Sequence, residues 1–152
     1  MSLIFPYTTF PTQNPIWTLH GRRGRPRPLI FVAVLGPSGT AVEKGLLDIG
    51  ADDTVFPDLV ATDIGIDLSQ APTGGASGVG SMSAVVLRYA EVVLRISDGQ
   101  EHREWPARVG FTSALLHRPL LGYAGFLQFF TASFHGDREW AELTVNAAYP
   151  GK

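Results

Sequence analysis

The sequence predicts an all-β protein with one or two short helices. One observation is a series of β-prone runs bounded by turn residues, which cover residues 29–35, 41–47, 82–96, 101–111, 131–134 and 139–145. Another is the set of 17 glycines and 11 prolines, which follow no period and favour many turns between short strands. With 152 residues, the chain is long enough for one domain with a hydrophobic core and short for two.

The composition is that of a globular protein, with 45% hydrophobic and 17% charged residues. A formal net charge of −2 gives no reason to expect a polyanionic partner. No window approaches the roughly 20 apolar residues of a membrane span, and the first residues lack the features of a signal peptide. The absence of cysteine excludes disulfides and thiolate metal sites. We therefore expect a soluble cytoplasmic protein without nucleic-acid or membrane partners.

Residues 1–28 hold five of the 11 prolines and predict an extended N-terminal arm, with residues 29–152 forming the domain. Ile16–Leu19 is a candidate short strand inside the arm. Four arginines follow in a stretch rich in glycine and proline, at Arg22, Arg23, Arg25 and Arg27. They could form an anion or nucleic-acid patch or a solvated loop. The acidic overall balance and the lack of interleaved aromatic residues favour the loop.

The middle of the chain predicts a short helix followed by a long hairpin. Pro57 and Asp58 mark a helix start, and Gly65 marks its end. Thr73–Ser81 contains four glycines and leads directly into the β-prone run 82–96. Glycine-rich hairpin tips have few side chains to pack against, so this stretch is predicted to be the most flexible part of the sequence.

The C-terminal part predicts a second helix and a closing hairpin. Over Tyr123–Phe130, apolar side chains recur at helical spacing. The β-prone runs that follow flank His135–Arg138, which has the composition of a turn.

The most informative stretch is Leu46-Leu47-Asp48-Ile49-Gly50-Ala51-Asp52-Asp53-Thr54-Val55-Phe56. A hairpin predicted over residues 29–47 ends at Asp48, so this carboxylate stands at a strand end. Gly50 leaves the neighbouring backbone bare, which allows another main chain to approach closely. A carboxylate held in this way can act as an acid or a base if a second carboxylate meets it.

This stretch resembles the active-site segment of the retropepsins, the aspartic proteases of retroviral type. Their pattern is two hydrophobic residues, Asp, Thr or Ser, Gly and Ala, which is Leu46–Ala51 here with Ile49 in place of the hydroxyl residue. A second family element, two apolar residues and a glycine, is similar to Leu120–Gly122. The resemblance covers residues 29–146. It implies a closed β-barrel, the acid protease fold, with a flap whose tip lies near Gly78–Gly80.

The resemblance also implies an activity, the hydrolysis of peptide bonds without metal or cofactor. That chemistry needs two carboxylates, yet the chain has a single Asp-x-Gly motif. The enzyme would therefore be a homodimer in which the catalytic Asp48 of each copy meets the other on a two-fold axis. The residues that would bind the peptide or protein substrate are Gly50, Ala51, Asp52, Asp53, Val79 and Gly80. In the family an arginine pairs with the position of Asp52, but Tyr123 stands in its place here.

Two other interpretations remain open. Isoleucine at position 49 has no hydroxyl to lock the two Asp loops together, so the protein could be a non-catalytic peptide-binding or interaction module. It could also be a structural β-domain whose role is to form a dimer. No Gly-x-Ser-x-Gly elbow or phosphate loop is present, and the four histidines lack the spacing of metal ligands. The aspartates at 48, 52 and 53 have too few neighbouring ligands for a calcium loop.

Overall fold

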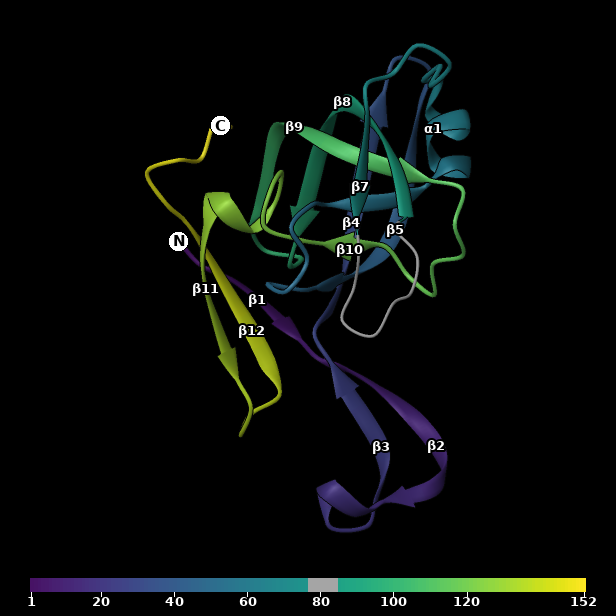
Figure 1. Cartoon of the computed structure of the whole chain (residues 1–152). Helices are drawn as coiled ribbons and strands as arrows, with labels where there is room; N and C mark the ends of the chain where they lie inside the picture. The colour runs from purple at the N-terminus through teal and green to yellow at the C-terminus, as the bar shows by residue number, and fades with distance from the viewer. Residues whose placement is uncertain (77–84) are drawn as a thin grey trace.

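A computed structural model describes residues 1–76 and 85–152, which are mostly β-structure (Figure 1). The strands are β1 (Leu3–Pro6), β2 (Thr8–Ile16), β3 (Arg22–Arg27), β4 (Leu29–Gly36), β5 (Gly39–Leu47), β6 (Val55–Pro57), β7 (Thr73–Ala76), β8 (Val85–Ser97), β9 (His102–Thr112), β10 (Leu120–Leu121), β11 (Phe130–His135) and β12 (Trp140–Val145). One α-helix, α1 (Asp58–Ile64), and two single-turn 3-10 helices at Trp17–Leu19 and Leu127–Phe129 complete the described elements. The predicted all-β class is confirmed.

Seven strands form the main sheet in the order β4-β5-β10-β6-β9-β8-β7, and β4 also pairs with β8. Three of the expected hairpins are present, β4–β5, β8–β9 and β11–β12, each with antiparallel pairing. The strand expected over residues 82–96 begins at Val85 in the described part of the chain. A second sheet has the order β1-β12-β11 and joins the two ends of the chain.

The hydrophobic core lies between the sheet strands and α1. Along β8, Val92, Leu94 and Ile96 are buried, whereas Glu91 and Arg95 between and beside them are exposed. This alternation is what a strand with one face on the core requires.

The predicted helix is confirmed as α1. It packs against β4 and β5, with Val60, Ala61 and Ile64 buried on its inner face. It ends at Gly65, whose φ of 81° is in the left-handed region. In the described parts of the chain, no helix has the length and apolar character needed to cross a bilayer.

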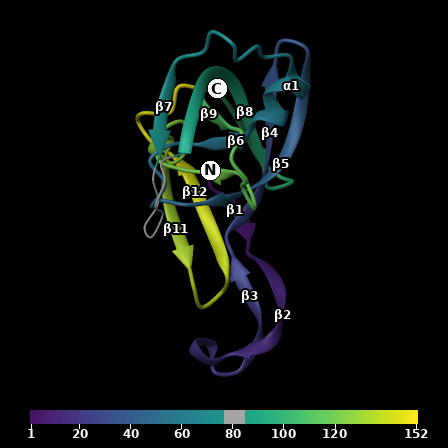
Figure 2. The ribbon, with the colours of Figure 1, turned by 45° about the vertical axis from the view of Figure 1, so that its right-hand side comes forward.

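The N-terminal segment is more regular than its sequence predicts. Strand β1 pairs with β12, and β2 and β3 form a hairpin that extends beyond the two sheets (Figures 1 and 2). The expectation of a loop at the four arginines is wrong, because they lie in β3. The strand expected over Ile16–Leu19 is also wrong, since a 3-10 turn begins at Trp17. A two-stranded ribbon has two free edges and therefore tolerates the prolines that suggested an irregular arm.

The helix expected over Tyr123–Phe130 is reduced to the 3-10 turn at Leu127–Phe129. Gly125 has a φ of 87°, which interrupts a right-handed helix. In a helix the carbonyls of Ala124 and Gly125 would accept amides four residues further on, but here they accept the Thr54 amide and hydroxyl and the Trp105 indole N–H. The apolar spacing is real, but tertiary hydrogen bonds determine the backbone here.

Asp98, in the turn between β8 and β9, connects β1 to the main sheet by a hydrogen bond. Its Oδ2 accepts the Ile4 amide at 3.1 Å, while Oδ1 accepts the amides of Glu101 at 2.8 Å and Gln100 at 2.9 Å. These donors, the Glu101 amide first, lower the pKa of the Asp98 carboxyl below its ordinary value of 3.8. The charged form of Asp98 therefore contributes to stability.

We expect the contribution of Asp98 to disappear in acid. The unfolded state binds a proton near pH 3.8 and the folded state only at lower pH, so stability falls as the pH drops through this window. Asp98→Asn should lower the unfolding midpoint at pH 7, and the gap to wild type should close toward pH 2. Thermal unfolding across this range tests the prediction, with the exposed Asp137→Asn as control. A gap that stays constant with pH would contradict it.

Candidate active site at the Asp48 loop

The ends of β5 and β10 bring the Asp48 loop and the Leu120–Gly122 segment together. The two strands run parallel, with Leu120 opposite Leu46 and Leu121 opposite Leu47. The Asp48 amide then donates to the carbonyl oxygen of Leu121 at 3.1 Å. In return, the amide of Tyr123 donates to Ala51 O at 2.9 Å. The loop is therefore held by main-chain bonds from both sides.

Gly122 and Thr54 make this close crossing possible. A Cβ on Gly122 would lie 2.2 Å from Asp53 O and 2.6 Å from Ala51 O, so no other residue fits without moving the loop. Thr54 is fully buried, and both its amide and its hydroxyl donate to Ala124 O, at 3.1 and 2.8 Å. Its own carbonyl accepts the Gly110 amide at 2.8 Å, which ties the crossing to β9.

The Asp48 carboxylate is fixed by its own loop. Its Oδ1 accepts the Gly50 amide at 2.9 Å, and its carbonyl accepts the Ala51 amide at 3.1 Å. Within residues 1–76 and 85–152, no hydrogen bond reaches its second carboxylate oxygen, and the side chain is half-buried. One oxygen thus orients the group while the other is available to water or to a second carboxylate.

The aspartate faces a cleft of about 240 Å³. Its lining includes five of the predicted site residues, namely Asp48, Gly50, Ala51, Asp52 and Asp53. The other two, Val79 and Gly80, lie outside the described residues, as does the predicted flap tip. Strands β7 and β8 pair from Thr73 to Ala76 and contribute Gly75, Ala76, Val85 and Leu87 to the lining of the cleft.

The apolar wall of this cleft was not predicted from the sequence. It consists of Gly75, Ala76, Val85, Leu87, Leu116 and Leu120, together with Val55. The spacing of Val85 and Leu87 by two residues places both on one face of β8, and this signal was readable from the sequence. Leu116 belongs to an irregular loop and carried no such signal. The wall gives the cleft the mainly apolar character that suits peptide side chains.

Asp53 lines the cleft and also connects the Asp48 loop to strand β8. The Tyr89 hydroxyl donates to Asp53 Oδ2 at 3.2 Å and so connects the loop to β8. Burial and, secondly, the Asp53 charge raise the pKa of the Tyr89 hydroxyl, which keeps this donor protonated. Tyr89 lies over Gly74 of β7, where a Cβ would come within 2.6 Å of its oxygen. Asp52 is exposed, and its carbonyl accepts the Ala124 amide at 2.8 Å.

Two large side chains on and near the Asp48 loop are exposed. Ile49 is 70% exposed, and Tyr123, whose amide bonds the loop, is 55% exposed. Ile49 offers no hydrogen-bond donor, as its sequence position indicated. The Asp48 loop therefore exposes the apolar Ile49 side chain together with the carboxylate of Asp52.

No protein-family model matches this chain, and no curated protein matches it either. Among the residues that the structure describes, no group of three or more histidine, aspartate or glutamate side chains could hold a metal ion.

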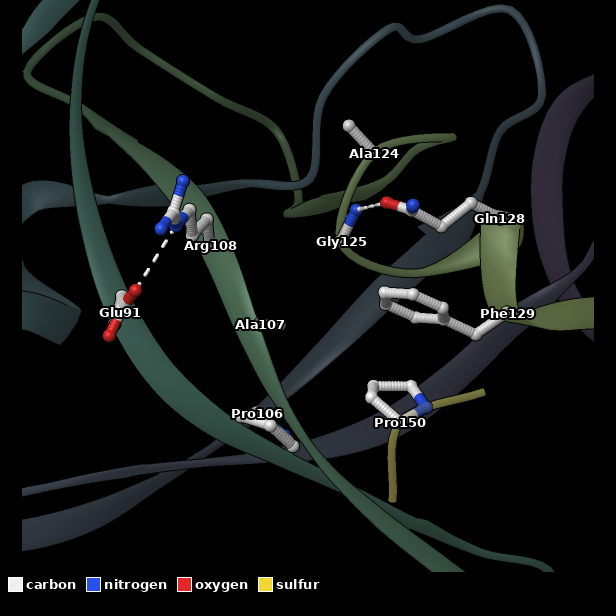
Figure 3. A pocket seen from close by; sticks show the side chains of 9 residues that line it. All are labelled: Glu91, Pro106, Ala107, Arg108, Ala124, Gly125, Gln128, Phe129 and Pro150. Carbon is white, nitrogen blue, oxygen red and sulfur yellow. Dashed lines mark hydrogen bonds and ion pairs between the residues drawn. The ribbon is translucent and has the colours of Figure 1, made fainter. Parts of the chain in front are cut away.

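A separate hollow of about 500 Å³ lies over β9 and the turn at Gly125 (Figure 3). Its charged groups are already paired, because Arg108 Nε contacts Glu91 Oε1 at 3.1 Å. Its amide group is also engaged, since Gln128 Oε1 accepts the Gly125 N–H at 2.7 Å. Pro106, Phe129 and Pro150 also line the hollow, and its one carboxylate, Glu91, is an exposed surface group already paired with Arg108.

Proposed function

We propose that this protein is an aspartic endopeptidase of the retropepsin type that acts as a homodimer. The observation that carries the proposal is the Asp48 carboxylate, fixed by Gly50 and clamped by the Leu120–Gly122 segment at the edge of a cleft. The pairing of β4 with β8, the two strands that flank most of the main sheet, supports a closed barrel of the acid protease fold.

The proposed mechanism uses two Asp48 side chains, one from each copy. Two carboxylates about 3 Å apart cannot both ionise easily, so they share one proton and titrate as a pair. The ionised group takes a proton from water as the water oxygen attacks the peptide carbonyl. The protonated group polarises the carbonyl oxygen and later helps to protonate the leaving nitrogen. The Asp48 oxygen to which the described residues donate no hydrogen bond is the atom available for these transfers.

The site is incomplete in one protomer, because a single Asp48 supplies a single carboxylate. The exposed Ile49 and Tyr123 next to it support a contact between copies at this place, since a second copy would remove their apolar surface from water. In such a dimer the aspartates approach one another from equivalent loops on a two-fold axis.

Sedimentation and peptidase assays on the same samples test this proposal. We expect a dimer whose cleavage of an unfolded protein at acidic pH stops with a statine-type inhibitor. The specific activity should rise with protein concentration through the same range in which the dimer forms. A chain that remains monomeric at every concentration and pH, or a dimer with its Asp48 groups pointing apart, would overturn the proposal.

The exposed Ile49 gives weight to a second candidate, a peptide-binding module without turnover. Without a hydroxyl at this position, the two Asp loops lack a bond that would hold the carboxylates in register. This candidate predicts that peptide binds to the cleft and is never cleaved. It also predicts that Asp48→Asn leaves peptide affinity unchanged, which equilibrium binding by fluorescence anisotropy would measure.

A further inference from the structure

The ribbon formed by β2 and β3 is the basic part of an otherwise acidic chain. All 14 aspartate and glutamate residues lie after position 42, and the four basic residues before it are the arginines of β3. The ribbon extends beyond both sheets (Figures 1 and 2). The formal net charge of −2 is therefore unevenly distributed. A local basic surface can bind an anion that the charge of the whole chain does not favour.

Arg22 fixes the ribbon against the β11–β12 turn. Its guanidinium donates to both carboxylate oxygens of Glu139, with Nη2 lying 3.0 Å from Oε2. At the base of the ribbon, the Tyr7 amide donates to Glu139 O at 2.7 Å. The ribbon is therefore held by side-chain and main-chain bonds to the same residue, and the charge of Arg22 is neutralised within the protomer.

Arg23 and Arg25 carry charges that the protomer does not neutralise. Among the described residues neither forms an ion pair with a carboxylate, and residues 77–84 contain no aspartate or glutamate. The two arginines lie two positions apart in β3, so their side chains leave the same face of the strand. Arg23 Nη1 donates to Gln13 O at 3.1 Å, which directs this guanidinium toward β2.

The fold places a tryptophan beside these arginines. The pairing of β2 with β3 becomes irregular toward the tip of the ribbon, and a hollow of about 600 Å³ lies there. Its lining includes Gln13, Asn14, Trp17 and Arg25. Trp17 is 90% exposed. In sequence no aromatic residue is interleaved with the arginines, but in the ribbon an exposed indole and a guanidinium border the same hollow.

Trp17 is presented by an ordered turn. Ile16, directly before it, is buried, and its carbonyl accepts the Gly21 amide at 2.9 Å. The His20 amide donates to Trp17 O at 3.1 Å. His20 and Gly21 have φ values of 53° and 85°, which reverse the chain into β3. The backbone below the indole is therefore fixed before a ligand binds, which lowers the entropic cost of binding.

We propose that the β2–β3 ribbon binds single-stranded nucleic acid near its tip. Proteins bind single strands with cations that follow the phosphates and with aromatic side chains on which bases stack. Here Arg23 and Arg25 bind phosphates, and Trp17 stacks on a base. Gln13 and Asn14 supply amide groups that can bond to base edges. The site is separate from the Asp48 cleft, and the inference goes beyond the proposed peptidase activity.

Other anionic partners match the ribbon less well. An acidic protein segment complements the arginines but offers no counterpart for the exposed indole. Duplex DNA keeps its base faces stacked inside the helix. An anionic membrane suits tryptophan and arginine, but Gln13, Asn14 and Thr18 beside the indole would lose their hydration in lipid. A single strand alone offers both phosphates and open base faces.

Fluorescence anisotropy with labelled single strands of about ten nucleotides tests the proposal. Deoxythymidine and uridine strands distinguish DNA from RNA as the source of the ligand. We expect wild type to bind at least one of them at low salt, more tightly than duplex DNA of the same length. Binding should also quench tryptophan fluorescence in wild type, and Trp17→Phe should remove this quenching.

Variants separate the stacking contribution from the charge contribution. Trp17→Ala should weaken binding by roughly 5- to 150-fold, the range for loss of one base–aromatic stack, and Trp17→Phe should retain most of the affinity. Arg25→Gln should reduce the slope of log K against log salt by about 0.7, and Arg23→Gln should do the same. Trp17→Ala should leave that slope unchanged. Arg108→Gln, which removes an 82% exposed arginine from β9, is the matched control and should change neither quantity.

Three results would overturn the proposal. The first is the absence of binding to either single strand at low salt. The second is single-strand binding that is unaltered in Trp17→Ala and in Arg25→Gln, since it would place the contact elsewhere. The third is binding of poly-glutamate or of phosphatidylserine vesicles that equals or exceeds single-strand binding and is lost in the same variants. None of these measurements depends on peptide cleavage, so the ribbon and the peptidase proposal are tested independently.

Discussion

Asp48→Asn is expected to lower the rate of peptide hydrolysis by about 10²–10⁴-fold or more, the typical contribution of a general acid or base. Asparagine has the same shape, and its side-chain oxygen can still accept the Gly50 amide that Asp48 Oδ1 accepts at 2.9 Å. The loop should therefore keep its conformation, and the unfolding midpoint should change little. Steady-state cleavage of an unfolded protein measures the rate, and circular dichroism confirms the fold.

The proposed dimeric site predicts a second effect of this variant. When wild type is mixed with excess Asp48→Asn protein, exchange of subunits should convert active dimers into mixed ones and remove activity. Asp137→Asn, an 80% exposed aspartate in the β11–β12 turn, makes the same chemical change and should leave the mixture active. Activity of the Asp48→Asn protein at the wild-type rate would exclude this carboxylate from the chemistry.

Trp105→Ala is expected to lower the free energy of unfolding by about 3–5 kcal/mol, the usual range for a buried tryptophan. Trp105 is 1% exposed, and its ring lies 5.2 Å from the centres of both Phe126 and Phe130 in edge-on geometry. Its indole N–H donates to Gly125 O at 3.0 Å, so alanine also leaves that buried carbonyl unpaired. Since small domains are stable by only about 5–15 kcal/mol, the variant should be marginal.

Urea denaturation at neutral pH measures this loss, with two variants as controls. Trp17→Ala removes the same side chain where it is 90% exposed, so its effect should stay within about 0.5 kcal/mol. Trp105→Phe keeps most of the apolar volume and loses the N–H, and it should lie between the two. Equal losses for Trp17→Ala and Trp105→Ala would show that the aromatic cluster does not stabilise the fold as described.

The sequence was sufficient for the all-β class and for much of the candidate site. The Asp48 loop, helix α1 and the β4–β5 hairpin depend on local signals, such as glycine, proline and alternating apolar residues. Each of these signals concerns residues that are close in sequence, so the structure that it favours depends little on the rest of the fold. The contact between the Asp48 loop and Leu120–Gly122 was expected only from the family resemblance. In the structure it is made by hydrogen bonds between residues far apart in sequence.

The features that were missed depend on partners far away in the sequence. Strand β3 has no apolar alternation, and it is stabilised by pairing with β2 and by the contact of Arg22 with Glu139. The Tyr123–Phe130 segment has helical spacing, but the carbonyls of Ala124 and Gly125 are bonded to Thr54 and Trp105. The Tyr89–Asp53 hydrogen bond likewise requires the tertiary structure.

The pairing of β1 with β12 has a consequence for biosynthesis. Leu3 lies opposite Leu143, so β1 cannot pair until β12, which is translated about 140 residues later, has been synthesised. Until then, the side chains of Leu3 and Phe5, which are buried in the folded protein, stay exposed in the nascent chain. Contacts of such long sequence separation also form slowly. The nascent chain should therefore be most dependent on chaperones in the interval before β12 emerges from the exit tunnel.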